Sequence, residues 1–161
     1  MSDYKGKIRA GTVGAKKVYA HEMVELVLED GRLRVPHPRT EDGEANPLDA
    51  GLERVFIEAR QPTVAQRAQI VIASGQAAQP DPNKPPPQID VGKMHTAAIL
   101  ACAYVPLVGE DGTPRSGGNE RAFEEADRAS LLEGPCGGWF ERLGSAIVGL
   151  MNGRAAIVGK A

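Results

Sequence analysis

The chain has 161 residues, of which 42% are hydrophobic and 25% charged, and such a composition is typical of a globular domain in water. Its formal net charge of −2 gives no overall attraction to nucleic acid, and its longest unbroken apolar run, residues 97–105, is far shorter than the ~20 residues of a membrane span. Two cysteines are too few for a disulfide framework, which favours a reducing cytoplasm. We therefore expect neither nucleic acid nor membrane among the partners.

The first 17 residues are predicted to form a flexible basic arm. They carry one acidic residue, Asp3, and five basic ones, Lys5, Lys7, Arg9, Lys16 and Lys17. Two interpretations fit this segment. One is a solvated end of the chain, because terminal segments fray unless other contacts hold them, and the other is an attachment for an acidic partner.

The next part of the chain has the pattern of a small sheet. Residues 24–29 and 32–35 alternate in hydropathy on either side of Asp30-Gly31. An Asp-Gly pair suits the two positive-φ positions of a tight turn, so the pattern predicts a β-hairpin. Residues 39–51 are then interpreted as a loop, and a third strand is predicted over 53–58. The result is a small N-terminal antiparallel β-sheet.

A helix is predicted after the third strand, from Thr63 to about Ala78. Thr63 and Gln66 fit a capping box, in which each side chain accepts a hydrogen bond from the other residue's backbone N–H. The apolar residues of this helix fall within about 100° of arc, opposite Gln66, and we expect this face to pack on the sheet: Val64, Ala68, Val71 and Ile72. Sheet and helix together make up residues 18–78.

Residues 79–92 contain five prolines and are predicted to form an extended linker with polyproline II character. The linker is interpreted as a hinge between two halves of the chain or as a surface crossing of a single domain. A proline-rich ligand for an aromatic-lined groove has a similar composition and is the alternative.

Residues 93–153 are predicted to form a helical part, followed by a tail over 154–161. A helix over 93–104 is apolar around nearly its whole circumference, which places it at the centre of a core. A tight turn at 110–114 and an acidic helix over 123–133 follow. The expected fold is therefore α+β, with the small N-terminal antiparallel β-sheet followed by a cluster of about four helices.

The last helix, over 139–151, has the strongest amphipathic pattern in the chain. Val148 is the one clear exception to an apolar arc of about 120°, which holds six residues: Trp139, Phe140, Leu143, Ile147, Leu150 and Met151. Trp and Met are enriched at the centres of protein interfaces, so this stripe is the candidate partner-binding face. Packing of the stripe against the helix over 93–104 is the alternative, and both interpretations stay open.

No pattern for catalysis, cofactor binding or metal binding stands out. The three histidines, His21, His37 and His95, have neither helical i, i+4 spacing nor a nearby set of cysteines. Residues 11–17 fail the spacing of a phosphate loop, and no Ser, His and Asp are arranged to suggest a triad. We therefore expect a non-enzymatic protein without a cofactor or a metal.

From residue 53 onward, the order of the elements resembles that of the tail assembly chaperones of long-tailed bacteriophages. In that family a strand leads into a capped helix, as VFIE at 55–58 leads into TVAQR at 63–67 here. An alanine-rich helix and a turn of the type Glu-Asp-Gly-x-Pro follow, matched by 97–102 and 110–114. An acidic helix, matched by 123–132, and an amphipathic helix that ends near Asn152-Gly153 complete the pattern.

The resemblance implies a function without chemistry. Such chaperones are thought to coat the long helical tape measure protein while the tail tube polymerises around it, and then to leave. It implies the tape measure protein as partner, with the tail tube protein and further copies of the chain as additional ones, and the host cytoplasm as location. The first 52 residues, the proline-rich linker and residues 115–120 are longer than the usual pattern. They leave a second hypothesis, a structural virion protein of the tail or the head–tail connector.

Overall fold

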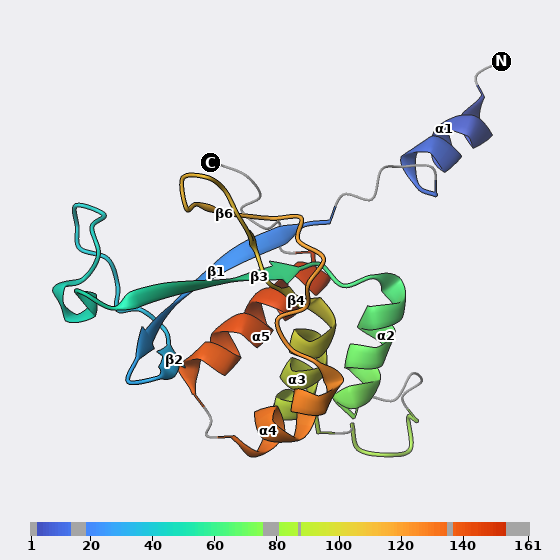
Figure 1. The fold of residues 1–161 in the computed structure, drawn as a ribbon. Helices are drawn as coiled ribbons and strands as arrows, with labels where there is room; N and C mark the ends of the chain where they lie inside the picture. Colours follow the sequence, from blue (N-terminus) through green and yellow to red (C-terminus); the bar gives the residue numbers. More distant parts are fainter. Residues whose placement is uncertain (1–2, 14–18, 76–80, 87, 135–136, 154–161) are drawn as a thin grey trace.

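The computed structural model describes residues 3–13, 19–75, 81–86, 88–134 and 137–153. Within these ranges a four-stranded antiparallel sheet carries a layer of helices on one face (Figure 1). The fold is therefore α+β, as predicted.

The sheet has the strand order β2-β1-β3-β4, with β1 at His21–Glu29, β2 at Arg32–Arg34, β3 at Glu53–Arg60 and β4 at Ala103–Tyr104. The predicted hairpin is confirmed, because Asp30 and Gly31 between β1 and β2 have φ values of 52° and 76°. β3 runs two residues further than predicted. β4 follows the proline-rich segment in the chain and pairs with β3, so the two halves of the chain share one sheet.

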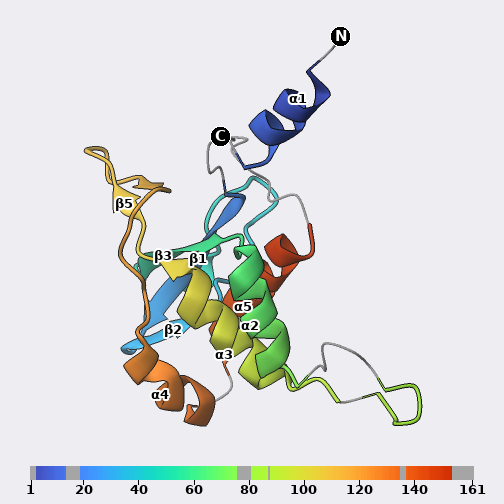
Figure 2. The ribbon, with the colours of Figure 1, turned by 90° about the vertical axis from the view of Figure 1, so that its right-hand side faces the viewer.

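The main helices are α2 at Val64–Ala73, α3 at Val91–Cys102 and α5 at Gly138–Met151. α3 packs against both α2 and α5, and the turned view shows α2 and α3 side by side below the sheet (Figure 2). A 3₁₀ turn, η2 at Glu125–Asp127, leads into the short α4 at Arg128–Glu133. The remaining elements are α1 at Tyr4–Gly11, η1 at Pro47–Asp49, and a small hairpin of β5 at Leu107–Val108 and β6 at Pro114–Arg115.

The hydrophobic core lies between the sheet and the helices α3 and α5. Val24 pairs with Ile57 across β1 and β3, and the two side chains belong to the buried cluster. From the helices, Ile99 of α3 and Leu143 and Ile147 of α5 complete this core. The central position predicted for the helix over 93–104 is confirmed.

Two helices end or begin differently from their predicted bounds. α3 ends at Cys102 because Ala103 and Tyr104 pair with β3 in the sheet. The acidic helix begins only at residue 125, since the chain before it runs extended beside β4, where the backbone N–H of Ala122 donates to the carbonyl oxygen of Ala103 at 3.0 Å.

The capping box of α2 is confirmed, but the face predicted to be buried is wrong. Ile70 is only 1% exposed, whereas Val64 is 89% and Ile72 68% exposed. Gln66 lies on the inner side of α2 because its amide forms hydrogen bonds with the end of α3: Nε2 donates to the carbonyl oxygen of Ala101 at 3.4 Å. The helix also ends earlier than predicted, at Ala73.

The basic N-terminal segment contains a helix that the sequence did not predict. Asp3 caps α1, since its Oδ1 accepts a hydrogen bond from the backbone N–H of Gly6 at 2.8 Å. No residue of α1 is buried, and the helix lies apart from the sheet and its helices in both ribbon views (Figures 1 and 2). Among the described residues, no helix combines the length and the apolar character that crossing a membrane requires.

Candidate functional site

The structure places the centre of the α5 stripe inside the molecule. Leu143 and Ile147 are fully buried and Leu150 is nearly so, against α3 and the sheet. The prediction that this stripe binds a partner is therefore wrong for these three residues, because they form the core that holds α5 in place. Met151 is half-buried against the same core.

The first two residues of the stripe, Trp139 and Phe140, have a different position. They are half-buried and line a groove of about 610 Å³ at the start of α5. Three residues from other elements also line this groove: Leu33 of β2, Phe123 before η2, and Leu131 of α4. We call the site formed by Leu33, Phe123, Leu131, Trp139 and Phe140 the aromatic groove.

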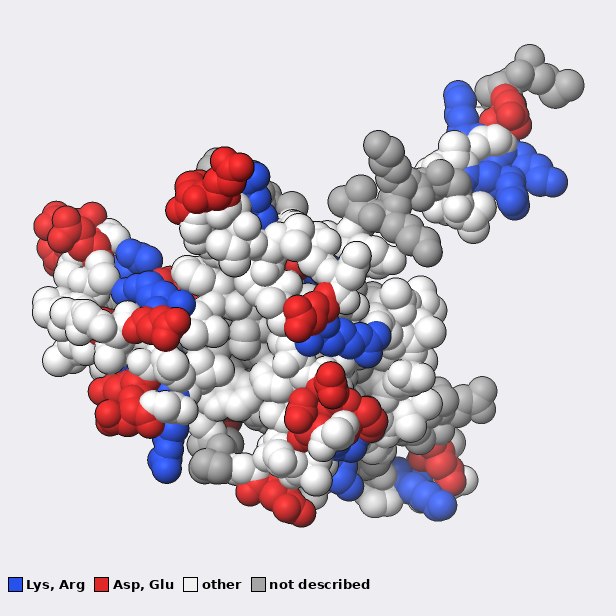
Figure 3. All heavy atoms as spheres, in the orientation of Figure 1, with Lys and Arg blue, Asp and Glu red and all other residues white. Residues whose placement is uncertain are grey.

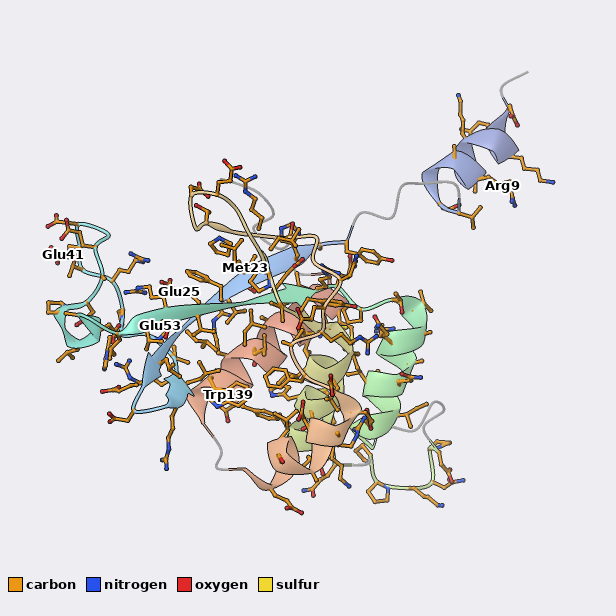
Figure 4. All side chains as sticks on the ribbon, viewed as in Figure 1. Arg9, Met23, Glu25, Glu41, Glu53 and Trp139 are labelled. Carbon is orange, nitrogen blue, oxygen red and sulfur yellow. The ribbon has the colours of Figure 1, made fainter. Side chains whose placement is uncertain are left out.

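The rings of the aromatic groove support one another. Phe123 stacks on Trp139 with centroids 5.9 Å apart and an interplanar angle of 18°, and Trp139 meets Phe140 edge-on at 6.0 Å and 89°. Offset-stacked and edge-to-face pairs are the favoured arrangements of aromatic rings. Figure 4 shows Trp139 below the sheet, on the same side as α4 and away from Met23 and Glu25. The groove is thus a preformed apolar surface.

Acidic residues gather on the segment that carries Phe123 and Leu131. The exposed Glu124 follows Phe123 in the chain, and the exposed Glu133 precedes Gly134, another lining residue. Figure 3 shows acidic groups around η2 and α4 on this face. Arg32 is the one basic residue among those that line the groove. The lining side chains are thus apolar apart from Arg32 and Ser130, and the acidic residues lie at the neighbouring η2 and α4.

Behind the groove, His95 packs as a neutral ring. It is 6% exposed, its ring centroid lies 6.0 Å from that of Phe140, and a Cβ on Gly144 would lie 2.5 Å from its Cγ. Its Nδ1 is buried without a hydrogen-bond partner among the described residues. Burial lowers the pKa of His95, and the nearby charge of Glu141 raises it to a smaller extent. His95 is therefore a packed histidine of α3.

The second histidine of interest, His37, belongs to an ion cluster. The buried carboxylate of Asp49 lies 2.8 Å from both Arg34 Nη2 and His37 Nδ1, and it accepts the backbone N–H of His37 at 2.8 Å. The hydrogen bond from the His37 side chain lowers the pKa of Asp49 to about 2. This cluster ties the loop after β2 to the edge of the sheet, and it has a structural role.

Cys102 is buried at the end of α3, and burial raises the pKa of its thiol to about 12, so that it is inert as a nucleophile. Within the described ranges, no group of three or more His, Cys, Asp or Glu side chains could hold a metal ion. Cys136 lies outside the described residues.

Comparisons with protein-family models, with curated proteins and with solved structures find no match to the chain. The site is therefore interpreted from its own geometry.

Sequence reasoning found two of the five residues of the aromatic groove. Phe123 and Leu131 were visible as the apolar positions of the predicted acidic helix, spaced eight residues apart, and this spacing was the available signal. Leu33 had no such signal, because only the position of the β1–β2 hairpin beside α5 brings it to the groove.

Proposed function

We propose that the chain is a non-enzymatic assembly chaperone that binds a helix of a partner protein in the aromatic groove. The observation that carries this proposal is the half-exposed cluster of Phe123, Trp139 and Phe140, which lies beside a groove instead of inside the core. Aromatic residues in a preformed pocket are the usual anchors of protein interfaces.

A helix is the ligand that fits this site best. An amphipathic helix places apolar side chains at i, i+3, i+4 and i+7 into a hydrophobic groove. The aromatic groove is open on one side and is bounded by two helices, α4 and α5, and by the edge strand β2. A groove of this size accepts one or two such anchors, and contacts of that kind are weak singly and become strong when many copies bind along one partner.

The proposed partner is the tape measure protein of a long-tailed bacteriophage, bound in the host cytoplasm during tail morphogenesis, with the tail tube protein as a second contact. The order of elements over residues 53–153 supports this partner, since a strand leads into a capped helix and a terminal amphipathic helix follows the turn at 110–114. A long helical protein also supplies the repeated anchors that a shallow groove needs.

The proposal is tested by filling the groove without disturbing the core. Ser130 and Ala129 are adjacent, exposed residues of α4, and only Ser130 lines the groove. Ser130→Trp is expected to weaken binding of the co-expressed tape measure protein at least tenfold, or about 1.4 kcal/mol. Ala129→Trp is expected to leave binding within about twofold. Equal binding by both variants would remove the groove as the site.

The structural-protein hypothesis is separated by mass spectrometry of purified virions. A chaperone that leaves after assembly is absent from the particle, whereas a component of the tail or connector is present in stoichiometric amounts.

A further inference from the structure

Contacts with the described residues bury none of the helix α1. It is eight residues long, none of its residues is buried, and its two large apolar side chains, Tyr4 and Ile8, are 71% and 60% exposed. Isolated helices shorter than about 12 residues are only marginally stable in water. Tyr4 and Ile8 are four residues apart and so lie on one face, as the anchors of a docked helix do.

The charge of α1 complements the border of the aromatic groove. Lys5, Lys7 and Arg9 lie around Tyr4 and Ile8, and α1 is the most basic projection in Figure 3. The groove offers apolar rings for two anchors, and the exposed Glu124 and Glu133 are chain neighbours of its lining residues Phe123 and Gly134. Opposite charges at the border of an apolar contact steer association and fix its register.

The groove of another copy is easier to reach than the groove of the same chain. In both ribbon views α1 and α4 lie at opposite ends of the molecule (Figures 1 and 2). Leu33, which lines the groove, pairs with Leu28 of β1. Leu28 lies seven residues along β1 from His21, and at 3.4 Å per residue the distance between them is about 24 Å. The chain from Gly11 to His21 spans at most about 36 Å. Docking in the same chain would therefore stretch this segment to about two thirds of its full length and fold it back along the sheet.

We propose that α1 of one copy docks in the aromatic groove of a second copy, with Tyr4 and Ile8 against Trp139 and Phe123. Each copy then gives one helix and one groove, so the contact is heterologous and repeats into rings or filaments. Because the proposed client helix uses the same groove, it displaces α1. Displacement of α1 by a client helix rests on the proposed function, whereas self-association does not.

Self-association is tested on the full chain alone, without any client. The mass of the protein is measured by light scattering and sedimentation from about 1 μM to about 1 mM, and it is expected to rise with concentration. The double variant Tyr4→Asp and Ile8→Asp, and the groove variant Ser130→Trp, are each expected to raise the dissociation constant at least tenfold. Val64→Asp changes an even more exposed apolar residue, on α2 and outside both surfaces, and this control is expected to associate as the parent does.

A mixing experiment tests the head-to-tail arrangement. The arm variant retains a groove and the groove variant retains an arm, so an equimolar mixture is expected to form a dimer although each variant alone is a monomer. A mixture that stays monomeric, or a parent chain that is a monomer over the whole range, overturns the proposal. Binding of the tape measure protein is measured separately. If the chain binds it but does not self-associate, only this inference is overturned. If the chain self-associates but does not bind it, only the proposed function is overturned.

Discussion

At the scale of single residues, the charged side chains of this protein fix loops to the sheet. Asp49 is the clearest case, because its carboxylate is buried between Arg34 and His37 while the neighbouring acids of the loop, Glu41 and Asp42, are exposed. The contact joins η1 to the end of β2 and to the start of the loop that follows it.

Stability is therefore expected to depend on pH through Asp49. Its pKa in the folded protein, about 2, lies below the value of about 3.9 in an unfolded chain, so the unfolded state takes up the proton first as the pH falls. The contribution is present above pH ~4 and is lost between pH ~4 and ~2. Asp49→Asn is expected to lower the urea midpoint at pH 7 and to reduce the loss of stability between pH ~4 and ~2, which we call the acid limb. Asp42→Asn, in the same loop, is the control, and an unchanged acid limb in Asp49→Asn would contradict the assignment.

At the scale of the helices, α2 shows how a tertiary contact decides which face is buried. Four of its apolar residues form a contiguous arc, yet Val64 and Ile72 of this arc are exposed, and the inner side carries Gln66 and Ile70. The amide of Gln66 reaches the last carbonyl groups of α3, so a polar residue is satisfied at an inner position. The hydropathy pattern of α2 gives no information about this contact.

The two isoleucines of α2 test the observed face directly. Ile70→Ala is expected to lower the free energy of unfolding by about 2–5 kcal/mol because it leaves a cavity in the core. Ile72→Ala is expected to change it by no more than about 0.5 kcal/mol, since the side chain is exposed. Urea denaturation of both variants decides the point, and the reverse order of losses would restore the face predicted from the sequence.

The contact between α3 and α5 depends on a glycine. A Cβ at Gly144 would lie 2.5 Å from His95 Cγ, whereas a Cβ at Gly138 of the same helix would lie 3.4 Å from Val35 Cγ2. Gly144→Ala is therefore expected to destabilise the protein by about 1–3 kcal/mol through overpacking. Gly138→Ala is expected to be neutral or stabilising by up to about 1 kcal/mol, as alanine favours helices over glycine. Equal melting temperatures of the two variants would contradict this packing.

At the scale of the whole molecule, both halves of the chain contribute to one core. Val24 and Ile57 come from the N-terminal sheet, and Ile99 and Ile147 come from the helices after the proline-rich segment. Cys102 lies in this core at the junction of α3 and β4. A buried group at such a junction becomes accessible only when the structure opens.

Cys102 is therefore expected to report global unfolding. In a Cys136→Ser background, a thiol reagent is expected to label the native protein at a rate set by the opening of the core, because the thiol is buried and its pKa is raised to about 12. The labelling rate is expected to rise with urea in parallel with unfolding followed by circular dichroism. Immediate labelling of the native protein would show that the two halves separate without global unfolding.

Local patterns were sufficient where neighbouring residues determine the structure. The Asp30-Gly31 turn and the Thr63–Gln66 capping box were predicted and are present, because their backbone geometry and hydrogen bonds involve residues within a few positions of each other. The early end of α3 could not be predicted, since Ala103 and Tyr104 are held by a strand more than forty residues earlier in the chain.

The sequence by itself determined the α+β class, the order of the first three strands and the main helices, and the amphipathic character of α5, because the period of apolar residues is a local property. The tertiary structure decided which apolar residues are core and which remain available. Leu143, Ile147 and Leu150 are core, whereas Trp139 and Phe140 join Leu33, Phe123 and Leu131 in a groove. The physical reason is that the burial of a residue depends on the side chains that pack against it. In the groove these side chains come from β2, the chain before η2, α4 and α5, which only folding brings together.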